Sequence, residues 1–377
     1  MFNTSKIKQF ENISSVSDSQ VVSFIPTSVQ ITINIFILVF AFFGNSFVVL
    51  FVLKTKKKAL SNRIIMNLAI CDLTLVFSSI PLHIVELYLG YFPLGKIGCH
   101  TIHPLSTMAV ISGSLTLVFL AIERFVAICF PFMYFRIANR SHYLLLTHLS
   151  ALCCVIPYSA TLKISVVEGK PQCSESWSRT SSLTYTVFLF AVQYGVPLPI
   201  ICFLYFIMWF KLKATNDESV RRSRITSSQQ ITYNKRDIKI DKKKGHKKSI
   251  KKRISNKIYQ DILKSRKKQT LSMFRLFMTL VIVFATFMLP NQITWLYMVF
   301  SKNPVHNKIW QIIAYWLTYT NAVINPLIYG TNQKYHLFLK KLIYRYKESQ
   351  KANEKTRSQI TIVQSGEVIL QRNNALE

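Results

Sequence analysis

Charged and amide side chains occur inside long apolar stretches of this chain. Asp72 lies within one stretch, Glu123 and Arg124 close another, and Asn325 with Pro326 lies in the last one. In an apolar environment, a charged group is stable only when it pairs with an opposite charge or with hydrogen-bonding neighbours. These residue types therefore predict ion pairs and hydrogen bonds inside the apolar stretches, and each costly polar group there indicates a specific role.

Bond-making chemistry is not indicated. The apolar stretches hold neither His/Cys spacing typical of metal ligands nor a nucleophile–base pair, and the seven cysteines do not cluster. We therefore expect no enzymatic activity, no metal and no cofactor.

The composition indicates which elements must position the polar residues. The chain has 377 residues and a net charge of +31, yet half of its residues are hydrophobic. This profile is typical of a membrane protein with basic connectors rather than of a protein that binds nucleic acid. The N-terminus is polar, so the first apolar segment is expected to insert as its own signal.

Seven apolar segments are long enough to cross a bilayer core, which takes roughly 20 residues of helix. They cover residues 29–53, 64–89, 98–130, 143–166, 183–210, 271–300 and 308–330. We therefore predict an all-α membrane protein, with a seven-transmembrane helix bundle over residues 29–330. Residues 331–347 are predicted to form an amphipathic helix on the cytoplasmic membrane surface, because their apolar positions recur at helical spacing among many charges. Residues 348–377 are then a cytoplasmic tail.

The distribution of Lys and Arg predicts the orientation. Residues 211–270, between the fifth and sixth segments, hold 21 Lys/Arg against five Asp/Glu, whereas the connectors on the other side are nearly balanced. Basic connectors stay on the cytoplasmic side. We therefore predict a multi-pass plasma-membrane protein with residues 1–28 outside, where Asn3 and Asn12 lie in glycosylation sequons. Residues 211–270 are predicted to be a disordered basic loop attracted to the anionic lipid bilayer.

Polar landmarks recur in a fixed order, one set in nearly every segment. They are Gly44-Asn45 in the first, Asn67 and Asp72 in the second, Glu123-Arg124 in the third, Pro197 and Tyr205 in the fifth, Phe284 and Pro290 in the sixth, and Asn321, Asn325, Pro326 and Tyr329 in the seventh. In this order the chain resembles the rhodopsin-like (class A) G-protein-coupled receptors, from about residue 30 to residue 347.

The resemblance implies roles for these residues. Arg124 is the switch residue, paired with Glu123 in the closed state and released toward Tyr205 and a heterotrimeric G protein when the sixth helix opens. Asn45, Asn321 and Asn325 are the expected partners of Asp72. The remaining switch residues by resemblance are Pro197, Phe284, Pro290, Pro326 and Tyr329. Arrestin is a further partner that the resemblance implies.

The outer face also carries implied features. Cys99 resembles the extracellular cysteine of the family, and Cys173 is its natural partner, so a disulfide is expected. Amine receptors have an acid where this chain has Ser106, which argues against a monoamine ligand. The sequence from Cys173 through Glu175 and Trp177 resembles neuropeptide receptors of the neuropeptide FF, orexin, tachykinin and cholecystokinin type, in which this loop forms a hairpin.

We therefore expect an extracellular peptide ligand, with Glu86 and Glu175 receiving a basic, amidated peptide. The expected ligand-binding residues are His83, Glu86, His103, Ser106, Glu175, Gln193, Asn291, Trp295, Tyr315 and Tyr319. A receptor of the same fold for a lipid or another small non-amine ligand is the alternative, since Ser106 is uncharged. A transporter or channel is the remote one, because only Asp72 is an acid midway in a span.

The chain departs from the family pattern at four places. Met288 replaces a frequent aromatic residue, so activation relies more on Phe284. Gly113 replaces a serine that often helps to bind sodium, which argues against a sodium ion at Asp72. The fourth segment lacks its customary Trp. Thr270 stands where an acid often pairs with Arg124, so some basal activity is expected.

Overall fold

The computed structural model describes residues 25–55, 60–137, 142–214, 246–301 and 308–331, and further positions between 335 and 351. Asn3, Asn12, residues 215–245 of the basic loop and the tail beyond 351 lie outside the described residues. The chain forms two units, Met1–Pro326 and Leu327–Glu377.

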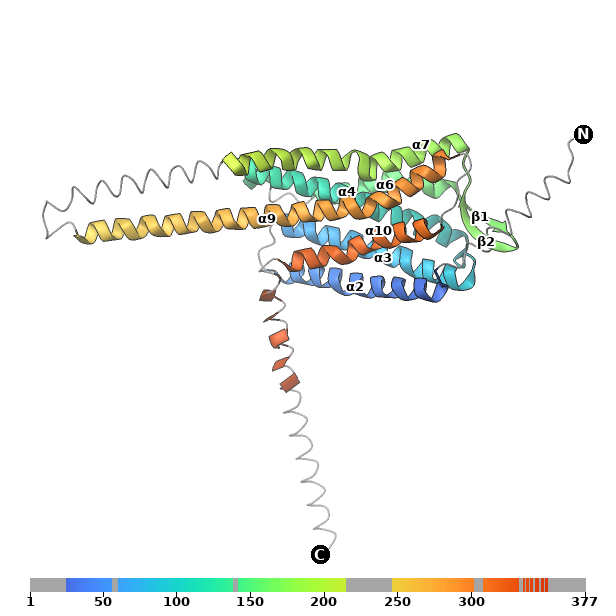
Figure 1. The fold of residues 1–377 in the computed structure, drawn as a ribbon, viewed down its shortest axis with the longest axis horizontal. Coiled ribbons are helices and arrows are strands. Elements are labelled where there is room, and N and C mark those ends of the chain that lie inside the picture. Colours follow the sequence, from blue (N-terminus) through green and yellow to red (C-terminus); the bar gives the residue numbers. More distant parts are fainter. Residues whose placement is uncertain are drawn as a thin grey trace, which may run out of the picture. The chain divides into compact units, whose positions relative to one another are not determined.

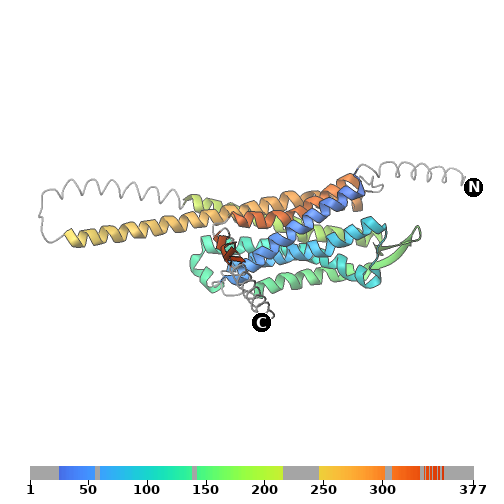
Figure 2. The ribbon, with the colours of Figure 1, turned by 90° about the horizontal axis from the view of Figure 1, so that it is seen from below.

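Long helices build the first unit and lie alongside one another (Figure 1, Figure 2). They are α2 (Thr27–Lys54), α3 (Leu60–Leu89), α4 (Gly95–Cys129), α6 (His142–Thr161), α7 (Arg179–Phe190) with its continuation through 214, α9 (His246–Phe300) and α10 (Lys308–Gly330) as far as Pro326. Six helical segments among the described residues are long and apolar enough to cross a membrane. α10 is not one of these six segments. Asn321, Asn325 and several Thr and Tyr residues lower its hydropathy.

The helices bury polar side chains and expose apolar ones. In α2, Asn34 and Asn45 are completely buried, whereas Phe36, Phe40 and Phe43 are exposed. This pattern is the reverse of a helix in a water-soluble protein. It is expected where lipid contacts the outer face, because polar groups are then more stable inside the bundle.

The fourth apolar segment is shorter than predicted. The prediction of a span over 143–166 was wrong at its end, since α6 stops at Thr161 and the chain continues as strand β1 (Leu162–Val167). β1 pairs antiparallel with β2 (Lys170–Glu175) around a turn in which Glu168 and Gly169 have positive φ angles of 51° and 76°. Two consecutive positive φ values are typical of the tight turns that suit a twisted hairpin. β-branched residues in Leu162–Val167 favour strand over helix.

The basic loop is also more regular than predicted. The prediction of disorder was wrong for residues 246–270, because α9 is one helix from His246 to Phe300. Lys, Arg, Gln, Ile and Leu favour helix, and no Pro or Gly occurs between His246 and Pro290. Extending an existing helix costs less than nucleating one, so the sixth span propagates into the basic sequence.

Three shorter features complete the description. α5 (Pro131–Ile137) follows α4, and a π-helix, η1 (Ala191–Gly195), interrupts the fifth span just before Pro197. The described positions between 335 and 351 are helical, which agrees with the predicted surface helix, although its position on a membrane stays a prediction. Within this second unit the rings of Tyr329 and Tyr335 stack at 6.3 Å between centroids.

Candidate functional site

Gly44 and Asn45 join α2 to α10. A Cβ atom on Gly44 would lie 3.0 Å from both Cβ and Cγ of Pro326, so any larger residue would require Pro326 to move by a few tenths of an ångström. One turn of α10 earlier, the side-chain nitrogen of Asn45 donates hydrogen bonds of 2.9 Å to the carbonyl oxygens of Ala41 and Ala322. The expectation that Asn45 bonds to Asp72 was wrong, because its side-chain nitrogen donates to the backbone of α2 and α10 and its Oδ1 has no hydrogen-bond partner.

Asp72 is bonded across the bundle to α10. Nδ2 of Asn325 donates to Oδ2 of Asp72 at 2.9 Å, which confirms one of the three expected partners. Asn321 is buried but its Oδ1 has no hydrogen-bond partner. Asp72, Asn321 and Asn325 line the same small cavity, together with Phe284 and Met288. The cavity thus brings together four predicted switch residues of α3, α9 and α10: Asp72, Phe284, Asn321 and Asn325.

The same cavity bears on the expectation that no sodium ion binds at Asp72. Its volume of about 20 Å³ holds one water-sized occupant. Hard cations require several oxygen ligands. Gly113 contributes no oxygen here, and the Ser114 hydroxyl is committed to the carbonyl of Gln193 at 2.7 Å. The lining keeps the side-chain oxygens of Asp72, Asn321 and Asn325 but lacks the one that a serine at position 113 would add, so weak sodium binding stays a prediction.

The π-helix η1 turns two side chains of the fifth span toward α9. Oε1 of Gln193 accepts a 2.9 Å hydrogen bond from Nε2 of Gln292, and both side chains are buried. The Tyr194 hydroxyl donates to the carbonyl oxygen of Ala285 at 3.0 Å, and the Tyr194 ring stacks on Phe284. Gln193, expected to contact ligand, therefore links the fifth and sixth spans, and Gln292 is a partner that the sequence analysis missed.

Arg124 forms an ion pair at the far end of α4. Its Nε lies 2.8 Å from Oε2 of Glu123, whose side chain is fully buried, and neither of these atoms forms a well-aligned hydrogen bond. The guanidinium carbon lies 4.7 Å from the centroid of the Phe277 ring on α9, a cation–π contact. The expected Glu123–Arg124 pair is present, and an aromatic contact joins it to the sixth span.

α5 adds a third member to this arrangement. The Tyr134 hydroxyl donates to Oε1 of Glu123 at 2.8 Å. Burial, together with the negative charge of Glu123 and this hydrogen bond, raises the pKa of Tyr134 to about 12, so the phenol stays a neutral donor at physiological pH. The sequence analysis missed Tyr134 because its partner becomes close only through the turn between α4 and α5.

Tyr205 is also placed at this end of the bundle. It is buried, and its ring lies 5.5 Å from that of Phe274 on α9. Pro290 lies inside α9 and removes one of its backbone hydrogen bonds. The contact of Tyr205 with Phe274 therefore joins the fifth and sixth spans beside Arg124.

A polar cluster joins α3, α4 and α6. His148 contacts Asn67 through Nε2 at 2.8 Å and Ser112 through Nδ1 at 3.0 Å. Nδ2 of Asn67 in turn donates to the Thr116 hydroxyl at 2.9 Å. The sequence analysis noted the missing Trp of the fourth segment but did not identify His148, which joins α6 to α3 and α4.

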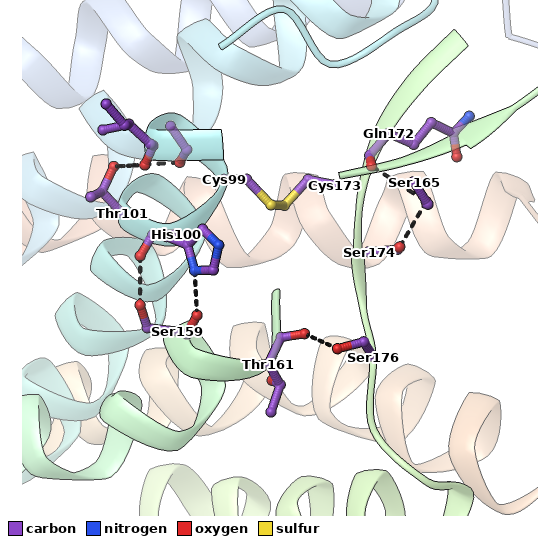
Figure 3. The surroundings of a disulfide bond; sticks show 12 residues. Cys99, His100, Thr101, Ser159, Thr161, Ser165, Gln172, Cys173, Ser174 and Ser176 are labelled. Atoms are coloured by element: carbon purple, nitrogen blue, oxygen red, sulfur yellow. Dashed lines mark hydrogen bonds between the residues drawn. A yellow bond between two sulfur atoms is a disulfide. The ribbon is translucent and has the colours of Figure 1, made fainter. Parts of the chain in front are cut away.

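The predicted disulfide between Cys99 and Cys173 is present (Figure 3). It joins the start of α4 to β2 across 74 residues, with 5.6 Å between the Cα atoms. Cys99 is buried in a cluster with Leu82, Phe92 and Leu162. Nearby, the Ser159 hydroxyl donates to the carbonyl of His100 at 2.7 Å, which fastens α6 to α4. The hairpin is thus held in one place over this end of the bundle.

The expected ligand-binding residues lie on six elements. They are His83 and Glu86 on α3, His103 and Ser106 on α4, Glu175 on β2, Gln193 on η1, Asn291 and Trp295 on α9, and Tyr315 and Tyr319 on α10. Not all of them are available to a ligand. Ser106 forms 2.8 Å hydrogen bonds with Ser78 and Ser79, and the His103 ring packs 5.8 Å from Phe92.

Glu175 is the exposed acid of this set. Its Oε2 accepts a 2.6 Å hydrogen bond from the indole nitrogen of Trp177, and the Trp177 ring lies 4.7 Å from that of Tyr185. The Tyr185 hydroxyl donates to the carbonyl of Cys154 at 3.0 Å. This chain of contacts holds the carboxylate of Glu175 at the end of the hairpin strand, beside the fifth span.

Comparison with known proteins agrees with this arrangement. Residues 44–329 match the model of a family described as 7 transmembrane receptor (rhodopsin family). The RYamide receptor of Drosophila melanogaster is 31% identical over 212 residues, which is 51% of this chain and 45% of that receptor.

Two further relatives have a similar sequence identity to this chain. Rhodopsin of Scyliorhinus canicula is 31% identical over 180 residues (45% of this chain, 51% of the relative). Neuropeptide Y receptor type 2 of Gallus gallus is 30% identical over 182 residues (45% of this chain, 47% of the relative). The chain matches about half the length of these curated relatives.

Proposed function

Because the chain belongs to the rhodopsin family of seven-transmembrane receptors, we propose that it is a plasma-membrane receptor for a neuropeptide that activates heterotrimeric G proteins. The hairpin end of the bundle then faces outside and the Arg124 end faces the cytoplasm. The basic connectors support this orientation. Arrestin is the second cytoplasmic partner of the proposal.

The arrangement around Arg124 is the observation that carries the proposal. Arg124 is paired with Glu123 and stacked on Phe277, and Tyr134 holds the same carboxylate. If α9 moves away, the cation–π contact is lost and the guanidinium becomes available to another acceptor. A G protein that binds this free guanidinium stabilises the open state, because a ligand shifts an equilibrium by its differential affinity for the two states.

A peptide ligand is supported at the other end. The β1–β2 hairpin is fixed by the disulfide, and it carries Glu175 at the end of β2. Glu86 lies half-buried on α3. Two acids near the mouth of a receptor suit a peptide with basic groups. Two of the matched relatives carry peptide names, the RYamide receptor and neuropeptide Y receptor type 2.

The test uses the full-length receptor in cells. A pool of amidated neuropeptides is screened with calcium and cAMP readouts, and an active peptide is then used on the Arg124→Ala variant. We expect retained peptide binding with loss of nucleotide exchange, because the guanidinium acts only in the open state. Arg275→Ala, at an exposed position of α9 two residues before Phe277, is the matched control and should signal normally.

Two outcomes would contradict the proposal. Full nucleotide exchange by Arg124→Ala would remove the switch mechanism. A response to lipids but to no peptide of the pool would leave the receptor mechanism in place and favour the non-amine small-ligand alternative.

A further inference from the structure

A groove of about 450 Å³ lies between α3 and α4, near the disulfide end of the bundle. Phe77, Pro81 and Val85 form its wall on α3, and Ile102 and Leu105 form its wall on α4. Leu94, just before α4, lies at its end. The groove is far larger than the cavity at Asp72, and its volume falls within the range of small-molecule sites.

The groove opens on the outer surface of the bundle. Phe77 is 49% exposed, Leu94 46% and Leu105 40%, although all three side chains are apolar. Phe77 and Val85 are eight residues apart in one helix, so the wall on α3 runs about 12 Å along the helix axis. In a membrane-spanning helix such a face contacts the hydrocarbon of the bilayer, and the groove is continuous with that surface.

The inner wall of the groove packs against the region of the disulfide. Leu82 and Ile102, which line the groove, also pack in the cluster that holds Cys99 and Phe92. The backbone nitrogen of Phe92 is bonded to the carbonyl of Pro171 on β2 at 2.9 Å. The disulfide and the hairpin therefore support the groove from behind, and it exists before any molecule enters it.

The groove is almost entirely apolar. None of its lining residues is charged, and the hydroxyl groups of Thr74 and Ser78 both already form hydrogen bonds within the protein. Thr74 donates to the carbonyl of Ile70 at 2.9 Å, and Ser78 donates to that of Thr74 at 2.7 Å. A peptide segment here would leave its backbone groups unpaired, at several kcal/mol each. An empty apolar groove would forfeit the dispersion contacts of its walls.

We propose that this groove binds an acyl chain of a bilayer phospholipid, from the leaflet on the side of the disulfide. A chain lies along the bilayer normal and fills a groove that runs along a helix, while its headgroup stays above Pro93 and Leu94. A sterol is the less suitable occupant, because its hydroxyl would lie at this end, where Pro93 and Leu94 provide no side-chain partner.

The bound chain also supports a helix contact. Ser78 lies in the groove, and its hydroxyl is 2.8 Å from that of Ser106, the residue after Leu105. An acyl chain that packs against Leu105 holds α3 and α4 together at this point. The lipid is therefore a structural ligand of the pair of helices that carries the disulfide.

The test reconstitutes the full-length protein in nanodiscs that contain phosphatidylcholine with a diazirine on one acyl chain. After irradiation, mass spectrometry locates the labelled residues. We expect labelling of the groove stretches of α3 and α4 at least fivefold above that of equally exposed helix faces, such as the one around Ile282. Equal labelling of groove and flat faces would overturn the proposal.

Substitutions that fill the groove provide the second arm. Leu105→Trp, and independently Val85→Phe, should reduce labelling of the α3 stretch at least fivefold. Ile282→Trp, at a 58% exposed position of α9 outside the groove, is the matched control and should leave that labelling unchanged. If a filling variant folds and its labelling is unchanged, the proposed acyl-chain site is refuted. If cholesterol competes with the labelled lipid and unlabelled phosphatidylcholine does not, the occupant of the groove is a sterol and the proposal is overturned.

Discussion

His148 on α6 and Asn67 on α3 are joined by a hydrogen bond of 2.8 Å, although they are 81 positions apart in the chain. Oδ1 of Asn67 accepts from Nε2 of His148, since Nδ2 of Asn67 already donates to Thr116. In that tautomer the Ser112 hydroxyl donates to Nδ1 of His148. One imidazole thus connects three helices.

His148→Phe should lower the stability of the receptor. The change removes both imidazole contacts and leaves the carbonyl of buried Asn67 unpaired, which costs about 1–3 kcal/mol. We expect the apparent Tm of the purified receptor to fall by roughly 3–8 °C. His142→Phe, at an exposed position of the same helix, is the control, and an equal fall in Tm there would contradict the role of the hydrogen bonds.

Loss of the disulfide should remove surface expression and ligand response together. The Cys99–Cys173 bond closes a loop of 74 residues, and restriction of such a loop in the unfolded chain contributes about 4–5 kcal/mol. Cys99→Ser and Cys173→Ser are compared by cell-surface antibody labelling with Cys153→Ser, which changes a free, exposed cysteine. Normal surface level and potency of the Cys99→Ser receptor would refute the prediction.

The two acids near the hairpin should determine the affinity for a basic peptide. A partly desolvated contact between an arginine of the peptide and Glu86 or Glu175 is worth roughly 1.5–3 kcal/mol, or about ten- to a hundredfold in affinity. Glu175→Gln or Glu86→Gln should therefore weaken a basic peptide agonist at least tenfold with surface expression intact. Glu168→Gln, at the turn of the same hairpin, should have no effect.

A matched change in the peptide checks this contact. Replacing the arginine of the peptide by citrulline should cause the same loss, and the two losses should not add if they report one contact. Wild-type potency of both Gln variants would favour the small-ligand alternative.

Sodium should have little effect on this receptor. Gly113 withholds one side-chain oxygen from the cavity at Asp72, so exchanging NaCl for KCl should change basal nucleotide exchange by less than about twofold. Gly113→Ser supplies a further oxygen, and its Cβ would lie at ordinary distances, 3.7 Å from Cys71 and 3.9 Å from Leu68. We expect this variant to gain a sodium-dependent decrease of at least threefold in basal exchange, relative to wild type. A strong sodium effect on the wild-type receptor would show that the cavity binds the ion as it stands.

Several features were predictable from the sequence because they depend on local pattern. A bilayer imposes a length and an apolar composition on each span, so seven spans were predicted. All seven are helices, and six of the described helical segments are long and apolar enough to cross a membrane. The order of landmarks identified the family, and with it the Cys99–Cys173 bond, the adjacent Glu123 and Arg124, and the pairing of Asp72 with Asn325. The boundaries at Thr161 and His246 were not predictable, since hydropathy does not tell where a strand replaces a helix or where a basic helix continues past the membrane.

Other features were decided by the tertiary structure alone. Asn45 uses its amide on the backbone of α10 because Gly44 lets Pro326 approach, and no pattern within either helix records that distance. His148 meets Asn67, Tyr134 meets Glu123, and Gln292 meets Gln193 only when the helices take their places in the bundle. The groove between Phe77 and Leu105 likewise exists only because α3 and α4 pack side by side, so the sequence of either helix alone does not predict it. A hydrogen bond or a cavity depends on distances of a few ångströms between elements, whereas hydropathy and spacing describe each element by itself.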